Sequence, residues 1–322
     1  MVPISRIDPT ANQLYFRGIN AVDLARSRDY ESVLFLLVNG NLPTDDQKRN
    51  LISRMNQFRD LYTEDMKSLE SLIDNLPSLT DENDLSNHDT LLAYVSLCPI
   101  VIANQFVISR GEEVKIPHKG LGHAANFLWQ ARGISPMERD LRDFQNALIL
   151  PMDDPDNPSL SALIAAYEGR RLEDSLQAAL KAHVGPLHHG AGTLAMEMFD
   201  EIQKPENTKA HLERRLSSGK KIFGLGHRIY TGIDPRAVEL REMLQARTEK
   251  TCDEWILHVA DTVAKVGGKL LAKHKGIEAY PNIDLYNAAV YYTFGFPPEM
   301  NTALFAISRA AGWMAHLLEI EQ

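Results

Sequence analysis

The sequence predicts an all-α fold, because strand-like patterns are confined to its start and helical patterns run through the rest. Residues 4–7 and 14–17 are the short alternating segments, and Pro9-Thr10-Ala11-Asn12 between them suits a hairpin turn. Elsewhere apolar residues recur at intervals of three and four, the period of an amphipathic helix. A chain of 322 residues, of which 44% are hydrophobic and 24% charged, can build a large core and more than one domain.

The first clear helix ends at a recognisable stop signal, and the next helix begins at a recognisable start signal. Residues 33–38 are apolar and are followed by Asn39-Gly40, a typical helix stop. Thr44 then opens the pattern Thr-Asp-Asp-Gln, which is a capping box. The apolar residues that follow it at helical spacing are Leu51, Met55 and Phe58.

Three further segments lead to expectations about packing. Residues 61–87 contain acids, serines and Pro77, which predicts an excursion over the surface. Residues 90–109 carry no charge, but Pro99, Asn104 and Gln105 interrupt them, which favours a pair of buried helices over a membrane span. Residues 204–218 are charged and polar, as in an exposed connection or helix.

The last helix carries two stripes. One is apolar and consists of Leu304, Ile307, Ala311, Met314 and Leu318. The other holds Arg309, Trp313 and His316, which are spaced by four and three residues and can therefore face one site together.

Composition narrows the classes of function. The formal net charge of −9 disfavours nucleic-acid binding, which needs a basic surface. Cys98 and Cys252 are too few for a disulfide framework and lack metal-ligand spacing. The adjacent His188 and His189 would point apart, which makes a poor chelate, so no metal is expected. The start of the chain lacks an apolar signal segment, so we expect a cytoplasmic protein that does not enter a membrane.

Three segments carry the chemistry. They are Gly185-Pro186-Leu187-His188-His189-Gly190, Gly224-Leu225-Gly226-His227-Arg228-Ile229-Tyr230 and Pro281-Asn282-Ile283-Asp284-Leu285-Tyr286. The glycines beside His188 and His227 let the backbone approach a ligand closely. Two imidazoles that donate hydrogen bonds and one carboxylate that accepts a proton suit carbanion chemistry beside a carbonyl.

Each residue also has a structural interpretation. His227 could be a hydrogen-bonding residue of its own turn, and Asp284 could cap the helix that follows it. Arg236, in Asp234-Pro235-Arg236, could pair with a nearby acid. Gly224-x-Gly226 lacks the third glycine and the preceding strand of a dinucleotide-binding motif.

The three segments, in this order, resemble those of the citrate synthase family. Other ordered stretches that resemble the bacterial-type members are Ile4-Ser5-Arg6-Ile7-Asp8, Tyr15-Phe16-Arg17-Gly18, Asn39-Gly40-Asn41-Leu42-Pro43-Thr44, Ala124-Ala125-Asn126-Phe127-Leu128 and Gly312-Trp313-Met314-Ala315-His316. The resemblance therefore covers nearly the whole chain.

The resemblance implies a Claisen condensation of acetyl-CoA with oxaloacetate. Asp284 would remove a proton from the thioester methyl group, and His188 would hold the thioester oxygen as charge develops. His227 would polarise the ketone of the oxo acid and supply its proton. Arg236 and Arg309 would bind substrate carboxylates, a task suited to a planar guanidinium. No tightly bound cofactor or metal is implied, and the coenzyme A thioester is a substrate.

The resemblance also implies the architecture. A large helical domain would comprise residues 1–190 and 292–322, and a small helical domain would comprise residues 191–291. Two chains would form a homodimer, with a paralogous chain as another possible partner and with no nucleic acid or membrane involved. Closure of one domain on the other would exclude water from the reactive thioester.

Several positions depart from the family pattern. Asp154, in Asp153-Asp154-Pro155-Asp156-Asn157-Pro158-Ser159, stands where the family has a histidine that contacts the oxo acid. A carboxylate there would repel a dicarboxylate unless it is protonated or paired, and the alternative is that Asp154 turns outward and caps the helix beginning near Ser159. His189 and Thr231 also replace a glycine and a basic residue. Family members usually continue beyond the position of Gln322 with an arginine-bearing tail, whose role Arg170, Arg171 or Arg228 could fill.

These departures keep two other functions open. One is a 2-methylcitrate synthase-like enzyme, or another condensing enzyme with a different 2-oxo acid or acyl-CoA. The other is a catalytically weak paralogue that acts as a binding or regulatory subunit.

Overall fold

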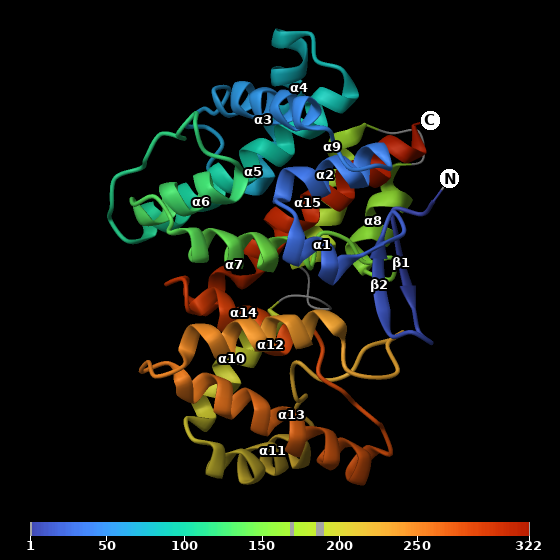
Figure 1. Cartoon of the computed structure of the whole chain (residues 1–322), viewed down its shortest axis with the longest axis vertical. Helices are drawn as coiled ribbons and strands as arrows, with labels where there is room; N and C mark the ends of the chain where they lie inside the picture. The colour runs from blue at the N-terminus through green and yellow to red at the C-terminus, as the bar shows by residue number, and fades with distance from the viewer. Residues whose placement is uncertain (1, 168–170, 185–189, 322) are drawn as a thin grey trace. The chain divides into compact units, whose positions relative to one another are not determined.

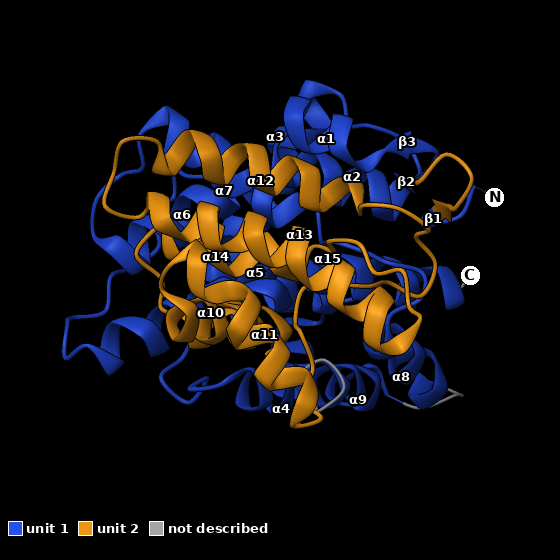
Figure 2. Cartoon of the chain, turned by 90° about the horizontal axis from the view of Figure 1, so that it is seen from below, with its two compact units in different colours: residues 1–6, 15–188, 303–322 blue, residues 7–14, 189–302 orange. Residues whose placement is uncertain are grey.

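The chain is mostly helical in the computed structural model, which describes residues 2–167, 171–184 and 190–321 (Figure 1). The all-α prediction is confirmed. The chain divides into two compact units, coloured in Figure 2. Unit 1 comprises residues 1–6, 15–188 and 303–322, and unit 2 comprises residues 7–14 and 189–302. The predicted small domain, 191–291, falls within unit 2, while the domain bounds themselves stay a prediction.

The start of the chain forms the predicted hairpin. Strands β1 (Ser5–Asp8) and β2 (Gln13–Phe16) are neighbours in a small sheet, which β3 (Ile19–Asn20) completes in the order β1-β2-β3. The carboxylate of Asp8 accepts hydrogen bonds from the backbone N–H groups of Thr10 and Ala11, at 3.0 and 2.9 Å. This closure of the turn explains why a proline-containing segment between two strand patterns folds back on itself.

Unit 1 is built on a run of helices that follows the hairpin. They are α1 (Ala21–Ser27), α2 (Tyr30–Asn39), α3 (Asp45–Arg59), α4 (Leu69–Asn83), α5 (Asn87–Ser109), α6 (His123–Arg132), α7 (Glu138–Ile149), α8 (Pro158–Tyr167), α9 (Leu172–Val184) and most of α15 (Asn301–Ile320). The predicted stop of α2 is confirmed, because Gly40 ends it in the left-handed conformation at φ +80°. The predicted capping box is also confirmed, with Thr44 and Gln47 bonded reciprocally at the start of α3.

The charge-free segment is one continuous helix, so the predicted pair of helices is wrong. Helix α5 runs from Asn87 to Ser109 with Pro99 inside it, and it packs against α3, α4 and α6. Proline removes one backbone donor, but packing on several sides can hold the helix together across it. By length and composition α5 is long and apolar enough to cross a membrane. However, 89% of its most apolar window is buried inside the protein, as in the core helix of a soluble protein.

The predicted surface excursion over residues 61–87 is also wrong. Most of this segment forms α4, which begins after a capping serine, Ser68, and includes Pro77. Leu72, Ile73 and Leu76 are fully buried on one side of it. The polar residues occupy the other side, so the segment is an amphipathic helix, which its average composition does not reveal.

Unit 2 is a second group of helices. They are α10 (Ala191–Ile202), the 3-10 turn η1 (Pro205–Asn207), α11 (Thr208–Ser217), α12 (Pro235–Thr248), α13 (Glu254–Lys275), α14 (Asp284–Tyr292) and the 3-10 turn η2 (Pro298–Met300). The polar segment 204–218 thus contains a helix, one of the two expected outcomes. Helix α14 contacts α10, α12 and α13, and its residues 285–291 are all buried. This central position fixes the helix that begins with Asp284.

Candidate active site

Two loops of unit 2 pair with each other and bring His227 and Asp284 onto adjacent segments. Gly226 N–H donates to the carbonyl of Tyr280 at 2.7 Å, and Asn282 N–H donates to the carbonyl of Gly224 at 3.0 Å. Leu225 and Pro281 lie opposite each other as an antiparallel bridge. A Cβ on Gly224 would lie 2.7 Å from the Cα of Leu285, and its φ is +78°. The pairing therefore requires glycine at position 224.

The ring of His227 is oriented by its own loop. Its Nδ1 accepts hydrogen bonds from the backbone N–H groups of Ile229 and Tyr230, at 3.2 and 3.3 Å. In a neutral imidazole whose Nδ1 is an acceptor, the proton is on Nε2. The predicted local hydrogen bonding of His227 is confirmed, and it leaves the residue as a donor through Nε2. A donor of this kind suits the polarisation of a carbonyl oxygen.

Asp284 is the first residue of α14, whose N-cap position is occupied by Ile283. The backbone N–H of Asp284 donates to Oδ1 of Asn282 at 3.0 Å. The interpretation of Asp284 as the cap is therefore wrong. At the start of α14 the positive end of the helix dipole stabilises negative charge, which suits a carboxylate that acts as a base.

Asn282 joins the two paired loops, a contact that its sequence motif alone did not predict. While its Oδ1 accepts from Asp284, its Nδ2 donates to the carbonyl of Gly226 at 2.8 Å. One side chain thus sets the spacing between the loop of His227 and the first turn of α14. An asparagine two residues before a predicted helix start is a recognisable turn signal, so half of this arrangement could have been predicted.

Arg236 is held by a buried carboxylate two residues before it. Its Nε and Nη2 donate to the two carboxylate oxygens of Asp234 at 3.0 and 2.9 Å. Arg236 is 2% exposed and Asp234 is fully buried. The pairing with a nearby acid, which the sequence left open, is therefore present. Because the pair fixes the orientation of the guanidinium, it is compatible with carboxylate binding, but that role stays a prediction.

In unit 1, a buried carboxylate organises the segment that precedes α8. Oδ2 of Asp153 lies 2.9 Å from Nε2 of His316 and accepts the hydroxyl of Ser5 at 2.5 Å. Burial by itself raises the pKa of Asp153, but the hydrogen bond and charge of His316, with Arg309 and Ser5, hold this pKa below its ordinary value. Trp313 donates from Nε1 to the hydroxyl of Ser159 at 3.2 Å. Trp313 and His316, two members of the second stripe predicted for the last helix, therefore both contact the segment before α8 or its first turn.

Asp154 lies inside the protein, and it does not cap α8. Its carboxylate accepts the backbone N–H of Asp156 at 3.1 Å, and the residue is 6% exposed. The side chain that caps α8 is that of Asn157, whose Oδ1 accepts the N–H of Leu160 at 2.9 Å. The interpretation of Asp154 as an outward-turned cap is wrong. Its contact with a substrate stays a prediction.

Arg309 is the third member of the polar stripe on α15. It is 4% exposed, and its guanidinium carbon lies 5.4 Å from the centre of the Phe305 ring. The positive charge of Arg309 also contributes to the low pKa of Asp153. A guanidinium buried beside this segment is suited to an anion, and its role as a carboxylate ligand stays a prediction.

Some predicted residues lie outside the part of the chain that the structure describes. His188 is one of them, and so is Arg170. Within residues 2–167, 171–184 and 190–321, no cluster of three or more His, Cys, Asp or Glu side chains is placed to hold a metal ion. Arg171 is in the described part and pairs with Glu173 at 3.4 Å.

Comparisons with known proteins agree over nearly the whole chain. The family model described as "Citrate synthase, C-terminal domain" matches residues 2–322. A citrate synthase of Haloferax volcanii is 30% identical, covering 98% of this chain and 88% of the relative. A citrate/2-methylcitrate synthase of Bacillus subtilis is 28% identical with the same coverage. The crystal structure of citrate synthase from Thermotoga maritima has a TM-score of 0.85 at 31% identity, covering 99% of this chain and 88% of that chain.

The buried position of Asp153 leads to a prediction about stability and pH. A carboxyl whose pKa is lowered by folding stabilises the protein above its unfolded pKa of about 3.9, and this stabilisation is lost as the pH falls through the folded pKa. Asp153→Asn should therefore lower the free energy of unfolding by about 2 kcal/mol at pH 7, and its deficit should shrink below about pH 4.

Urea unfolding at a series of pH values measures both effects. Asp60→Asn is the matched control, because it removes a carboxylate from an exposed pair with Lys119 and should change little. A deficit that stays constant down to pH values where the wild type unfolds would contradict the assignment.

Proposed function

This chain belongs to the citrate synthase family, and we propose that it condenses acetyl-CoA with oxaloacetate and then hydrolyses the thioester. The observation that carries the proposal is the pairing of residues 224–226 with residues 280–282, because it places a histidine donor and a carboxylate on adjacent segments of one unit. The citrate synthases of other organisms supply the substrate class.

Each catalytic residue has one task in this proposal. Asp284 takes a proton from the methyl group of the thioester, while His188 donates a hydrogen bond to the thioester oxygen, which gains negative charge. The resulting enol or enolate carbon attacks the ketone carbon of oxaloacetate. His227 gives the proton on Nε2 to the ketone oxygen as it becomes a hydroxyl. Water then cleaves the thioester, which releases the free thiol of coenzyme A and the tricarboxylate.

The role of Asp284 can be tested by the release of free thiol from acetyl-CoA in the presence of oxaloacetate. Asp284→Asn keeps the shape of the side chain but removes the base, so kcat should fall by about two to four orders of magnitude. Asp65→Asn, which changes an exposed carboxylate of unit 1, is the control and should keep the wild-type rate. If Asp284→Asn retains most of the wild-type kcat, Asp284 is not the base.

Asn282 should act on catalysis by holding two other residues in place. Asn282→Ala loses both of its hydrogen bonds, so the loop of His227 and the start of α14 are no longer tied together. We expect kcat to fall by about tenfold to a hundredfold with a smaller change in the KM for oxaloacetate.

Asn282→Ser provides the conservative comparison. Its hydroxyl can still accept the N–H of Asp284, so kcat should recover part of the loss. A purely structural role predicts loss of folded protein with an unchanged kcat per folded molecule, and that result would rule out a positioning role.

A second candidate is an enzyme of the same family that uses a different oxo acid or acyl-CoA, such as propanoyl-CoA. The observation that favours it is Asp154, a buried carboxylate at the position where the resemblance implies a histidine. The similarity to a citrate/2-methylcitrate synthase is compatible with this alternative. A catalytically weak paralogue remains the alternative of another class.

Asp154→His tests how this residue affects the choice of oxo acid. If Asp154 faces the oxo acid, the variant should condense oxaloacetate with a higher kcat/KM, because a donor replaces an anion beside a dianionic substrate. Thiol release measured with a panel of 2-oxo acids and with acetyl-CoA and propanoyl-CoA compares the substrates. An unchanged kcat/KM for oxaloacetate would show that Asp154 does not set the preference.

We also propose that the enzyme works as a homodimer in the cytoplasm and takes part in the tricarboxylic acid cycle. Unit 1 exposes several large apolar side chains, and contact with a partner chain would remove them from water. They are Ile108, Ile116, Ile134 and Met137, which are 62%, 85%, 59% and 72% exposed. The net charge of −9 is compatible with partners other than nucleic acid.

A further inference from the structure

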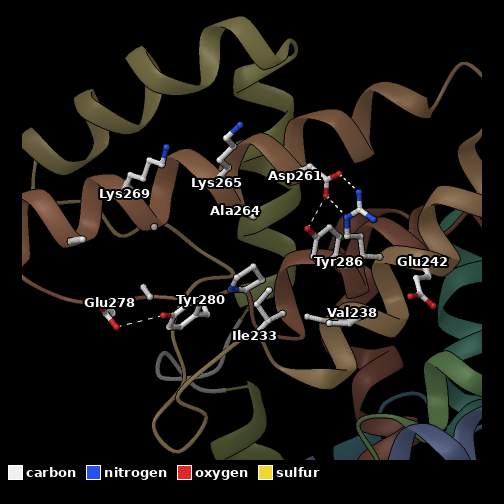
Figure 3. Close-up of a pocket in the computed structure, with 16 residues that line it drawn as sticks. Ile233, Val238, Glu242, Asp261, Ala264, Lys265, Lys269, Glu278, Tyr280 and Tyr286 are labelled. Atoms are coloured by element: carbon white, nitrogen blue, oxygen red, sulfur yellow. Dashed lines mark hydrogen bonds and ion pairs between the residues drawn. The ribbon is translucent and has the colours of Figure 1, made fainter. Parts of the chain in front are cut away.

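A groove of about 720 Å³ lies between α12 and α13 in unit 2 (Figure 3). The segment 278–281 closes it on a third side. The side chains that line it do not include those of His227, Arg236 or Asp284. Its size is within the range of small-molecule sites, which is about 300–1,000 Å³. The groove is therefore lined by residues to which no task in the condensation has been assigned above.

Five small residues contribute to the lining of the groove and are here called its floor. They are Ala237 on α12, Ala264, Gly268 and Ala272 on α13, and Ala279 on the closing segment. A Cβ on Gly268 would lie 3.0 Å from the carbonyl oxygen of Ala279, so glycine allows the closing segment to lie close to α13. A floor without polar side chains favours an apolar ligand body.

Large apolar side chains surround the groove and are partly exposed to solvent. Ile233, Val238 and Tyr280 are 45%, 42% and 39% exposed. Three such residues around one cavity are an apolar surface that a ligand could cover. Burial of this surface would favour binding in proportion to the area removed from water.

At one end of the groove, the charged side chains of Arg241 and Asp261 form an ion pair with each other. Arg241 binds both carboxylate oxygens of Asp261 at 2.8 and 2.5 Å, and the hydroxyl of Tyr286 donates to Asp261 at 2.9 Å. Burial, together with the charge of Asp261, raises the pKa of Tyr286 well above its usual value, so the hydroxyl stays protonated. This end offers contact area rather than an unpaired charge.

Two other charged residues of the groove, both lysines, have no such ion pair among the described residues. Lys265 and Lys269 line the groove, are exposed and lie one turn apart on α13. Figure 3 shows both side chains directed away from Ile233 and Tyr280. Among the described residues, neither ammonium group forms an ion pair or hydrogen bond. The nearby Glu278 accepts the hydroxyl of Tyr280 at 3.5 Å. A lysine has a flexible four-carbon stem, so an ammonium group must turn toward the groove to contact a ligand there.

We propose that this groove binds a small amphiphilic anion, with its apolar body between α12 and α13 and its carboxylate or phosphate at Lys265 and Lys269. The apolar floor selects the body of the ligand, and the two lysines select the sign of its head group. A cationic head group would place like charges together at the rim. The side chains of His227, Arg236 and Asp284 take no part in the proposed binding.

Isothermal titration calorimetry or saturation-transfer NMR tests the proposal on the full chain with three probes of equal length. Octanoate and octyl phosphate carry the two head groups, and octanol carries none. The two anions should bind saturably at one site per chain, about tenfold more tightly than octanol, because two exposed ion pairs contribute modestly. Tighter binding of octyl phosphate assigns the site to phosphate esters, and tighter binding of octanoate assigns it to carboxylates.

Variants of α13 separate the two parts of the site. The double variant Lys265→Gln with Lys269→Gln should lower the affinity for the two anions to that for octanol. The control is the double variant Lys273→Gln with Lys275→Gln, which lies on the same helix but outside the groove and should leave the affinities unchanged. Ala264→Phe should abolish binding of all three probes by filling the floor. Ala272→Phe serves the same purpose if circular dichroism shows that Ala264→Phe disturbs the helix.

Equal affinity for octanol and the anions would overturn the proposed recognition, and so would anion binding that the Lys265 and Lys269 changes do not weaken. The absence of saturable binding by any probe would overturn the site itself. None of these readouts involves thiol release, so a failure here is distinct from a failure of the proposed condensation.

Discussion

The pairing of residues 224–226 with residues 280–282 is the constraint on which the candidate site in unit 2 depends. Neither segment is part of a long helix, so the spacing of His227 and Asp284 is set by a few backbone hydrogen bonds and by the side chain of Asn282. Gly224 makes the pairing possible because the backbone of Leu285 leaves no room for a Cβ. Reactive groups held by a network of this kind keep their orientation without reorganising during the reaction.

In unit 1, a buried carboxylate links parts of the chain that are distant in the sequence. Asp153 joins Ser5 near the first residues to His316 on the last helix. A buried carboxylate is costly unless hydrogen bonds and positive charge compensate it, and here His316 and Arg309 contribute both. Because Asp154 follows directly in the chain, the anchoring of Asp153 also restricts where Asp154 can lie.

The sequence predicted the fold where signals are local and failed where packing decides. The capping box at Thr44 and the stop at Gly40 depend on residues within one turn, and both are present. Helix α5 continues through Pro99 because neighbouring helices support it, which no local signal reveals. The apolar side of α4 was hidden by the acids and serines on its other side.

The same division applies to the candidate site. The residue types of the candidate site and the pairing of Arg236 with Asp234 could be predicted from nearby positions in the sequence. The contact of Asn282 with Gly226 spans 56 residues, so no local pattern predicts it.

Residues 278–286 contribute to both the groove and the candidate site. This segment supplies Tyr280 and Tyr286 to the groove, and it also supplies Asn282 and Asp284 to the candidate site. A ligand that fixed Tyr280 in the groove would therefore act on backbone atoms that are hydrogen-bonded to the loop of His227.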